Sequence, residues 1–117
     1  MKIIVAGGRD AEPALYLVDK AIEESGMKKD MTQLVHGAAR GIDSAAGEWA
    51  KINNIPVHVF PADWSKYGKS AGPIRNKQMA EYADALIAIW DGISRGTKHM
   101  IETAESMNLK IYIYDYS

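Results

Sequence analysis

Short runs of apolar residues alternate with segments of helical periodicity along this chain, and this alternation restricts its fold more than any other feature. Five runs are expected to form strands, at residues 3–6, 33–35, 55–60, 85–90 and 110–114. Strands that alternate with helices build parallel sheets through right-handed crossovers, with helices on both faces. We therefore predict an α/β fold with a five-stranded parallel sheet in the order 3-2-1-4-5.

The first helical segment shows how the helices are expected to pack. Asp10 is in position to cap this helix, and Pro13 is acceptable in a first helical turn. Leu15, Val18 and Ile22 recur at helical spacing, so they are predicted to face the core.

Three further segments are expected between the later strands. Residues 44–52 carry small and apolar residues and predict a second helix. Residues 61–71 are polar and are predicted to form a long loop before a helix over residues 72–84. The last helix is expected to turn Met100, Ile101, Ala104 and Met107 inwards.

Composition excludes several classes of function. A chain of 117 residues is expected to form a single domain. The absence of cysteine excludes disulfides and thiolate chemistry, and the three histidines lack the spacing of metal ligands. The net charge of −1 does not favour a nucleic-acid partner. We expect a cytoplasmic protein with no membrane segment, no cofactor and no metal site.

The predicted sheet order places a ligand-binding crevice. Open parallel sheets bind ligands beyond the carboxyl ends of their strands, where the strand order reverses. Here that position lies between strands one and four, flanked by strand two. Three loops meet there, at residues 7–10, 36–43 and 91–97, and each combines glycine with arginine before a helix begins. This pattern predicts a site for a phosphate-bearing ligand.

The loop at residues 36–43 allows a second interpretation. Gly37 and Gly41 let backbone N–H groups approach a phosphate, and Arg40 supplies a guanidinium. A tight turn with Asp43 as the N-cap of the next helix would also account for both glycines.

Residues 92–96 match the G-x-S-x-G pattern of serine hydrolases. That chemistry requires a histidine base paired with an acid, and only His99 follows Ser94. We therefore interpret Ser94 and Thr97 as hydroxyl donors and helix caps over a phosphate.

Three other features have both a functional and a structural interpretation. Trp64 and Tyr67 lie in the long loop, where they could stack on a nucleobase or pack on the protein's own surface. Arg75 and Asn76, at the start of the third helix, are expected near the loop after strand four. Glu48 on the second helix could face the crevice or water.

Taken together, these motifs resemble the SLOG superfamily of Rossmann-like domains, and the resemblance covers nearly the whole chain. Residues 37–43 resemble the G-x-A-x-G-I-D segment of the DprA/Smf proteins. Residues 75–79 resemble the R-N-R and R-K-x-x-M helix starts of DprA and of the LOG phosphoribohydrolases. Residues 92–97 resemble the LOG G-x-G-T loop, and residues 7–10 resemble the small stand-alone YspA/YpsA-related branch.

The resemblance implies a Rossmann-like three-layer sandwich that binds a nucleotide or a ligand of the NAD or ADP-ribose type, as a sensor or a sequestering protein. The alternatives that it implies are a LOG-like N-glycosidic hydrolase and a DprA-like single-stranded DNA binder. Candidate catalytic residues are Asp43, Glu48 and Arg75. LOG enzymes carry a glutamate three residues after the G-T pair, where this chain has Met100. Binding without hydrolysis is therefore the favoured expectation.

The loops and the resemblance together imply a set of ligand-binding residues and an assembly. The binding residues are Gly7, Gly8, Arg9, Asp10, His36, Gly37, Ala38, Arg40, Gly41, Asp43, Arg75, Asn76, Asp91, Gly92, Ser94, Arg95, Gly96 and Thr97. A homodimer or larger homo-oligomer is also expected. Tyr82, Met79 and Trp64 support it, because they lie on segments that have little core left to enter.

Overall fold

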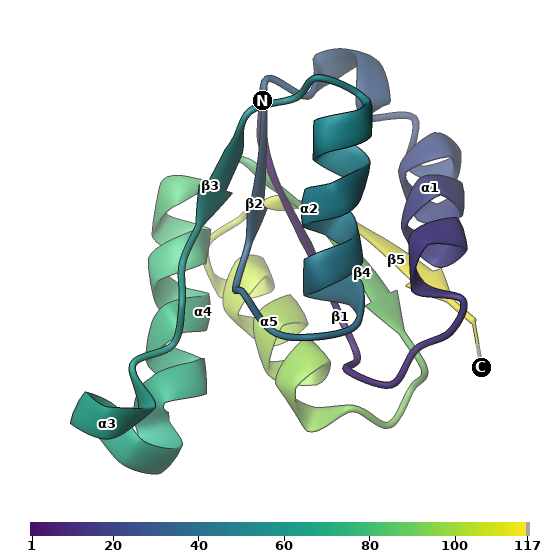
Figure 1. Cartoon of the computed structure of the whole chain (residues 1–117). Coiled ribbons are helices and arrows are strands. Elements are labelled where there is room, and N and C mark those ends of the chain that lie inside the picture. Colours follow the sequence, from purple (N-terminus) through teal and green to yellow (C-terminus); the bar gives the residue numbers. More distant parts are fainter. Residues whose placement is uncertain (117) are drawn as a thin grey trace.

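A five-stranded parallel sheet forms the centre of the computed structural model, which describes residues 1–116 (Figure 1). Its strands are β1 (Lys2–Gly7), β2 (Gln33–His36), β3 (Val57–Val59), β4 (Ala85–Trp90) and β5 (Lys110–Asp115). Their order is β3-β2-β1-β4-β5, and every neighbouring pair is parallel. The predicted fold class and topology are therefore confirmed.

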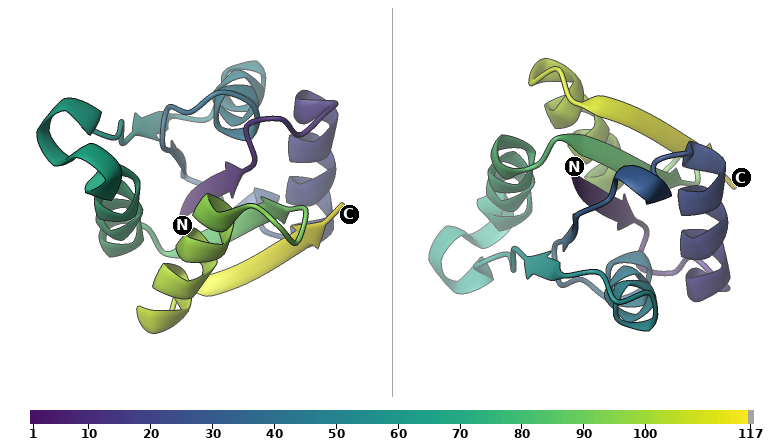
Figure 2. Two further views of the ribbon diagram at one scale, coloured as in Figure 1. Left: turned by 90° about the horizontal axis from the view of Figure 1, so that it is seen from below. Right: turned by 90° about the horizontal axis from the view of Figure 1, so that it is seen from above.

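Helices cover both faces of this sheet. Helices α1 (Ala14–Ser25) and α2 (Ile42–Ile52) lie on one face, and α4 (Ala71–Tyr82) and α5 (Arg95–Ser106) lie on the other (Figure 2). A short 3-10 helix, η1 (Lys28–Asp30), follows α1.

The apolar run of β1 feeds two separate cores. Ile3 and Val5 pack with α1 and α2, whereas Ile4 and Ala6 pack with α4 and α5. Successive side chains of a strand point to opposite faces of the sheet. A central strand covered on both faces therefore needs an unbroken apolar run, as β1 and β4 have.

Strand β3 is shorter than predicted and forms one edge of the sheet. Only Val57–Val59 is a strand, and all its residues are exposed. Pro56 has no N–H to donate to a ladder, although its carbonyl oxygen accepts a hydrogen bond from Leu34.

Helix α1 begins later than predicted. Its N-cap is Pro13, which makes no side-chain capping bond, so the prediction that Asp10 caps this helix is wrong. The buried stripe is Leu17, Val18, Ala21 and Ile22, whereas Leu15 is 37% exposed. Leu15 precedes Leu17 by two residues, or about 200° around the helix, and therefore points away from the core.

The segment predicted as a long loop is largely helical. Asp63 accepts a hydrogen bond from the N–H of Lys66 at 3.1 Å and thereby caps the short helix α3 (Trp64–Tyr67). The 3-10 helix η2 (Gly68–Ser70) then leads directly into α4. In Figure 1, α3 projects at the lower left, at the carboxyl-terminal edge of the sheet.

Of the side chains that support an oligomer, Met79 lies in the core and Tyr82 packs against it. Met79 is 2% exposed, and the Tyr82 hydroxyl donates to Gln33 while its ring contacts those of His58 and Phe60. Of the three aromatic or methionine side chains, only Trp64 remains exposed. A homo-oligomer therefore stays a prediction with weaker support. Within residues 1–116 no helix has the length and apolar character needed to span a membrane.

Candidate functional site

A cleft of about 860 Å³ opens at the carboxyl ends of β1 and β4, where the strand order reverses. All strands run downwards in Figure 1, so the loops that follow them gather at the lower edge. Of the residues predicted to bind a ligand, those lining the cleft are Gly7, Gly8, Arg9, Asp10, Asp43, Arg75, Asn76, Asp91, Ser94, Arg95, Gly96 and Thr97. Those outside its lining are His36, Gly37, Ala38, Arg40, Gly41 and Gly92.

Arg75 links α4 to the loop after β2. Its terminal nitrogen donates to the carbonyl oxygen of Gly37, and its Nε donates to Oδ1 of Asn76 at 3.1 Å. A Cβ atom at position 37 would overlap this guanidinium. Arg75 thus contacts the loop after β2, and it lines the same cleft as residues of the loop after β4. Asn76 does reach that loop, with its Nδ2 3.5 Å from the carbonyl oxygen of Gly96.

Asp43 is a buried carboxylate in the first turn of α2, with its side chain turned back towards the loop. Its Oδ2 accepts hydrogen bonds from the N–H groups of Gly37 and Ala39, at 3.1 and 3.3 Å. The residue at the N-cap is Gly41, whose φ of 76° requires glycine, so the interpretation of Asp43 as the N-cap is wrong.

The environment of Asp43 also changes its acidity. Burial raises the pKa of this carboxyl to about 6, although the two backbone donors and the charges of Arg75 and Arg9 oppose the shift. Its second oxygen has no hydrogen-bond partner within residues 1–116 and is not buried, so it faces the cleft that Asp43 lines.

His36 shapes the same loop from inside the protein. Its Nδ1 accepts a hydrogen bond from the N–H of Ala38 at 3.0 Å, and burial together with the charge of Arg75 lowers its pKa. A neutral imidazole that accepts at Nδ1 carries its proton on Nε2. His36 thus positions Ala38, whose φ is 62°, rather than lining the cleft.

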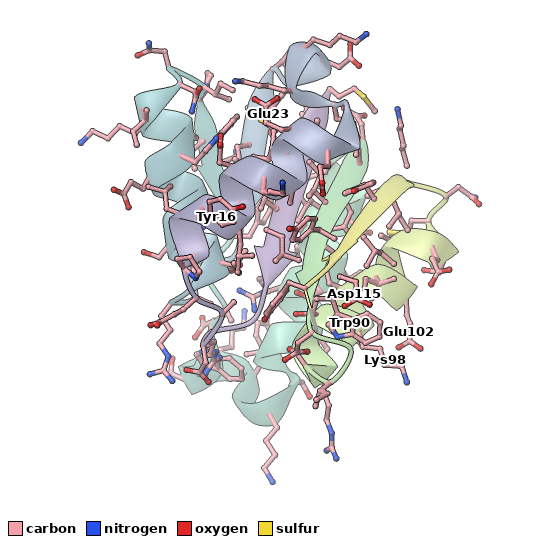
Figure 3. All side chains as sticks on the ribbon, turned by 90° about the vertical axis from the view of Figure 1, so that its right-hand side faces the viewer. Tyr16, Glu23, Trp90, Lys98, Glu102 and Asp115 are labelled. Atoms are coloured by element: carbon pink, nitrogen blue, oxygen red, sulfur yellow. The ribbon has the colours of Figure 1, made fainter. Side chains whose placement is uncertain are left out.

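The loop after β4 is held by its own side chains. Asp91 accepts hydrogen bonds from the N–H groups of Ile93 and Ser94, both at 2.8 Å, and these donors lower its pKa. Trp90, labelled at the lower end of β4 in Figure 3, donates from Nε1 to the carbonyl oxygen of Ser94 at 3.1 Å. The α5 N-terminus is thereby fixed against the cleft.

The hydroxyl of Ser94 does not cap α5 as predicted. Ser94 is at the N-cap of α5, but its hydroxyl makes no capping bond and lies 3.2 Å from that of Thr97. His99 pairs with Asn76 rather than with Ser94, and its Nδ1 is 3.1 Å from Nδ2 of Asn76. The G-x-S-x-G match therefore forms no serine–histidine pair.

Arg40 and Glu48 lie away from the cleft lining. Arg40 forms an ion pair with Asp10 at 3.3 Å, with both side chains largely exposed. Glu48 is an exposed residue of α2 and is absent from the lining.

Several cleft residues were not in the predicted binding set. The most informative are Trp64, Met79, His99, Met100 and Tyr116. Of these, only Trp64 could be suspected from the sequence to contact a ligand, because it is an aromatic residue in a polar segment. Within residues 1–116, no group of three or more histidine, cysteine or acidic side chains could hold a metal ion.

The sheet order defines a Rossmann-like α/β protein with a cleft at the carboxyl ends of its strands. The chain belongs to the YspA, cpYpsA-related SLOG family, whose model matches residues 1–67. It is also similar to the Gene 61 protein of Mycobacterium phage D29, with 29% identity over 116 residues that cover 94% of this chain and 93% of that protein.

Solved structures share the fold. DNA processing protein A (DprA) from Streptococcus pneumoniae superposes with a TM-score of 0.78 at 21% identity, over 99% of this chain and 50% of that one. The structural-genomics target TM1055 gives a TM-score of 0.67 at 16% identity, over 94% of this chain and 71% of that one. DprA from Helicobacter pylori, described with a single-stranded DNA binding mode, gives 0.64 at 17% identity, over 97% of this chain and 64% of that one. The chain thus spans half the length of the Streptococcus pneumoniae protein.

Proposed function

We propose that the cleft binds a phosphate-bearing nucleotide or nucleotide-derived ligand of the NAD or ADP-ribose type, and that the protein acts as a sensor or a sequestering protein. A volume of about 860 Å³ is in the range of small-molecule sites. The ligand's phosphates would lie against Arg9, Arg75 and the amino-terminal end of α5.

The charge arrangement in the cleft carries this proposal. Asp43 and Asp91 each accept hydrogen bonds from backbone N–H groups, and Asp10 is paired with Arg40. Three arginines line the same cleft, namely Arg9, Arg75 and Arg95. None of them forms an ion pair within 4 Å in the described part of the chain, residues 1–116.

Cationic side chains whose acidic neighbours are already engaged suit an anionic ligand. An extended nucleic acid is less favoured, because the whole chain carries a net charge of −1.

A LOG-like N-glycosidic hydrolase is the second candidate, and Asp43 is the observation that favours it. A carboxyl group with a pKa of about 6 beside an arginine is suited to general acid–base chemistry. Met100, which is buried where LOG enzymes carry a glutamate, favours binding without hydrolysis.

Calorimetry with AMP, ADP, ADP-ribose and NAD tests the proposal, followed by chromatography of the recovered ligand. We expect at least one of these ligands to bind the wild type and to be recovered unchanged. Arg75→Ala should weaken that binding by about tenfold to a hundredfold, the usual loss for a hydrogen bond to a charged group. Release of a free base would show that the protein is a hydrolase instead. If none of the four ligands binds, the proposal is refuted. Mass spectrometry of small molecules released by heat would identify a ligand that copurifies.

A further inference from the structure

His99 is a cleft-lining side chain that the binding loops do not include. It lies on the second turn of α5, one residue before the buried Met100, and is partly exposed. Its Nδ1 is 3.1 Å from Nδ2 of Asn76, which is 6% exposed and projects from the facing helix α4.

The orientation of the Asn76 amide follows from its other neighbour. Oδ1 of Asn76 accepts from Nε of Arg75 at 3.1 Å, and an arginine can only donate. A flipped amide would place two donors against each other at that contact. Nδ2 of Asn76 therefore faces His99, where it donates to Nδ1 and can also approach the carbonyl oxygen of Gly96 at 3.5 Å.

This contact fixes the tautomer of His99. A neutral imidazole that accepts at Nδ1 carries its proton on Nε2. Thr103 does not compete, because its hydroxyl donates to the carbonyl oxygen of His99 at 2.8 Å and is 3.5 Å from Nδ1. The described residues, 1–116, include no partner for Nε2, and no buried side-chain nitrogen among them lacks one. The Nε2–H group is therefore open to solvent on a residue that lines the cleft.

We propose that His99 donates a hydrogen bond from Nε2 to an uncharged acceptor in the nucleoside part of the ligand, and that Asn76 is the residue that positions it. This inference rests on the proposed function, since it assigns one end of the same ligand. The surroundings favour a nucleoside rather than a phosphate group here. The apolar Met79 and Met100, from the same two helices as Asn76 and His99, also line the cleft, whereas Arg9 and Arg75 supply the cationic donors.

The residue proposed to bind phosphate and the residue proposed to bind the nucleoside are linked by hydrogen bonds. Arg75 is held by Gly37 and Asn76, and the same amide holds His99. Asn76 therefore contacts both the charged donor for phosphate and the neutral donor for the nucleoside.

The binding test compares ADP with inorganic pyrophosphate by calorimetry. His99→Ala should weaken ADP binding about fivefold to tenfold, as expected for one neutral hydrogen bond, and leave pyrophosphate binding unchanged. Arg75→Ala should weaken both. His58→Ala is the matched control, because His58 lies on β3 outside the cleft lining and should change neither.

The positioning role of Asn76 has a test that needs no ligand. Nitrogen-15 NMR of the histidine side chains should show His99 protonated at Nε2 in the wild type, with His99→Ala used for assignment. Asn76→Asp keeps an acceptor for Arg75 but presents an oxygen to Nδ1. We expect Nδ1 of His99 to be protonated in this variant, in contrast to the wild type.

The results distinguish a failure of the role assigned to His99 from a failure of the proposed function. If the wild type binds pyrophosphate and ADP but His99→Ala binds ADP as tightly, the assignment of His99 is wrong while the proposed function stands. An Nδ1-protonated His99 in the wild type would overturn the assignment as well. If the wild type binds neither probe nor any of the four nucleotide ligands, the proposed function fails and this inference fails with it.

Discussion

The guanidinium of Arg75 occupies the space that a side chain at position 37 would need. Arg75 donates to the carbonyl oxygen of Gly37 across 38 residues of sequence, and a Cβ atom at position 37 would overlap it. The backbone does not account for this glycine, because Gly37 is not among the residues of positive φ in the described chain. Because Gly37 has no side chain, Arg75 of α4 can lie against the backbone at the end of β2.

Gly37→Ala should therefore reduce ligand binding without a comparable loss of stability. The group that must move is the end of a flexible side chain, so we expect the free energy of unfolding to fall by less than about 1 kcal/mol. Ligand affinity should fall as in Arg75→Ala, by about tenfold to a hundredfold. Urea unfolding and calorimetry measure the two effects.

A double-mutant cycle provides the control. If Gly37→Ala acts through Arg75, the double variant should bind no more weakly than Arg75→Ala alone.

Gly41→Ala is the contrasting substitution. It combines a φ of 76° with backbone oxygens of Arg9 and Gly8 at 2.5 and 2.6 Å from the added Cβ, so it should cost about 1–3 kcal/mol of stability. Additive losses of affinity in the Gly37→Ala and Arg75→Ala cycle would contradict the prediction that Gly37→Ala acts through Arg75.

Asp43→Asn should change how stability depends on pH. The folded protein raises the pKa of Asp43 from 3.8 to about 6 and so binds this proton more tightly than the unfolded chain does. Stability must then decrease as pH rises from about 4 to about 6, by up to about 3 kcal/mol at 1.36 kcal/mol per pKa unit. The asparagine variant lacks this loss, while its side-chain oxygen can still accept from Gly37 and Ala39.

Chemical unfolding at pH 4, 5, 6 and 7 checks this prediction. The stability of Asp43→Asn relative to the wild type should rise across this range and then level off above pH 6. Other carboxyl groups titrate in both proteins, so their effects cancel in the comparison. Parallel stability curves for the two proteins would show that Asp43 ionises in the folded state as it does in the unfolded chain.

The sequence was sufficient to predict the sheet and the position of the cleft. Continuous apolar runs identified β1 and β4 as buried strands, and strand–helix alternation fixed the parallel topology. In such a sheet the loops that follow β1, β2 and β4 must meet at one edge, so the place where Arg9, Asp43 and Arg95 gather was predictable.

The contacts between side chains were not predictable from periodicity. Helical spacing assigns Arg75 and His99 to helices, but it does not give the rotation of α4 against α5 or against β2. Neither the contact of Arg75 with Gly37 nor the pairing of Asn76 with His99, 23 residues away, follows from that spacing. Likewise, nothing in the sequence distinguished the inward-facing His36 from a ligand-contacting histidine.

Trp64 provides a spectroscopic test for a nucleobase. Its side chain lines the cleft from α3 and is 51% exposed, whereas Trp49 is 2% exposed and donates to Asp19. We expect a bound nucleotide to quench the emission of Trp64. Trp64→Ala should weaken nucleotide binding about fivefold to a hundredfold, the range measured for base–aromatic stacking, and Trp64→Phe should largely preserve it.

The control for this test is Tyr67→Ala. Tyr67 lies on the same short helix but does not line the main cleft, so its loss should leave nucleotide affinity unchanged. If Trp64→Ala binds nucleotide as tightly as the wild type, Trp64 does not stack on the nucleobase.

Arg75 and Arg40, which were both predicted to bind the ligand, should differ in their contribution to affinity. Arg75 lines the cleft and is held by Gly37 and Asn76. Arg40 does not line the cleft, is 74% exposed, and pairs with Asp10 at the edge of the lining. An exposed ion pair contributes about 0–1 kcal/mol, so Arg40→Ala should leave stability nearly unchanged and weaken ligand binding no more than about threefold. Arg75→Ala should weaken it about tenfold to a hundredfold. Calorimetry of both variants with one nucleotide at a fixed salt concentration measures the difference. A larger loss in Arg40→Ala than in Arg75→Ala would place the phosphates beside Arg40, outside the cleft lining.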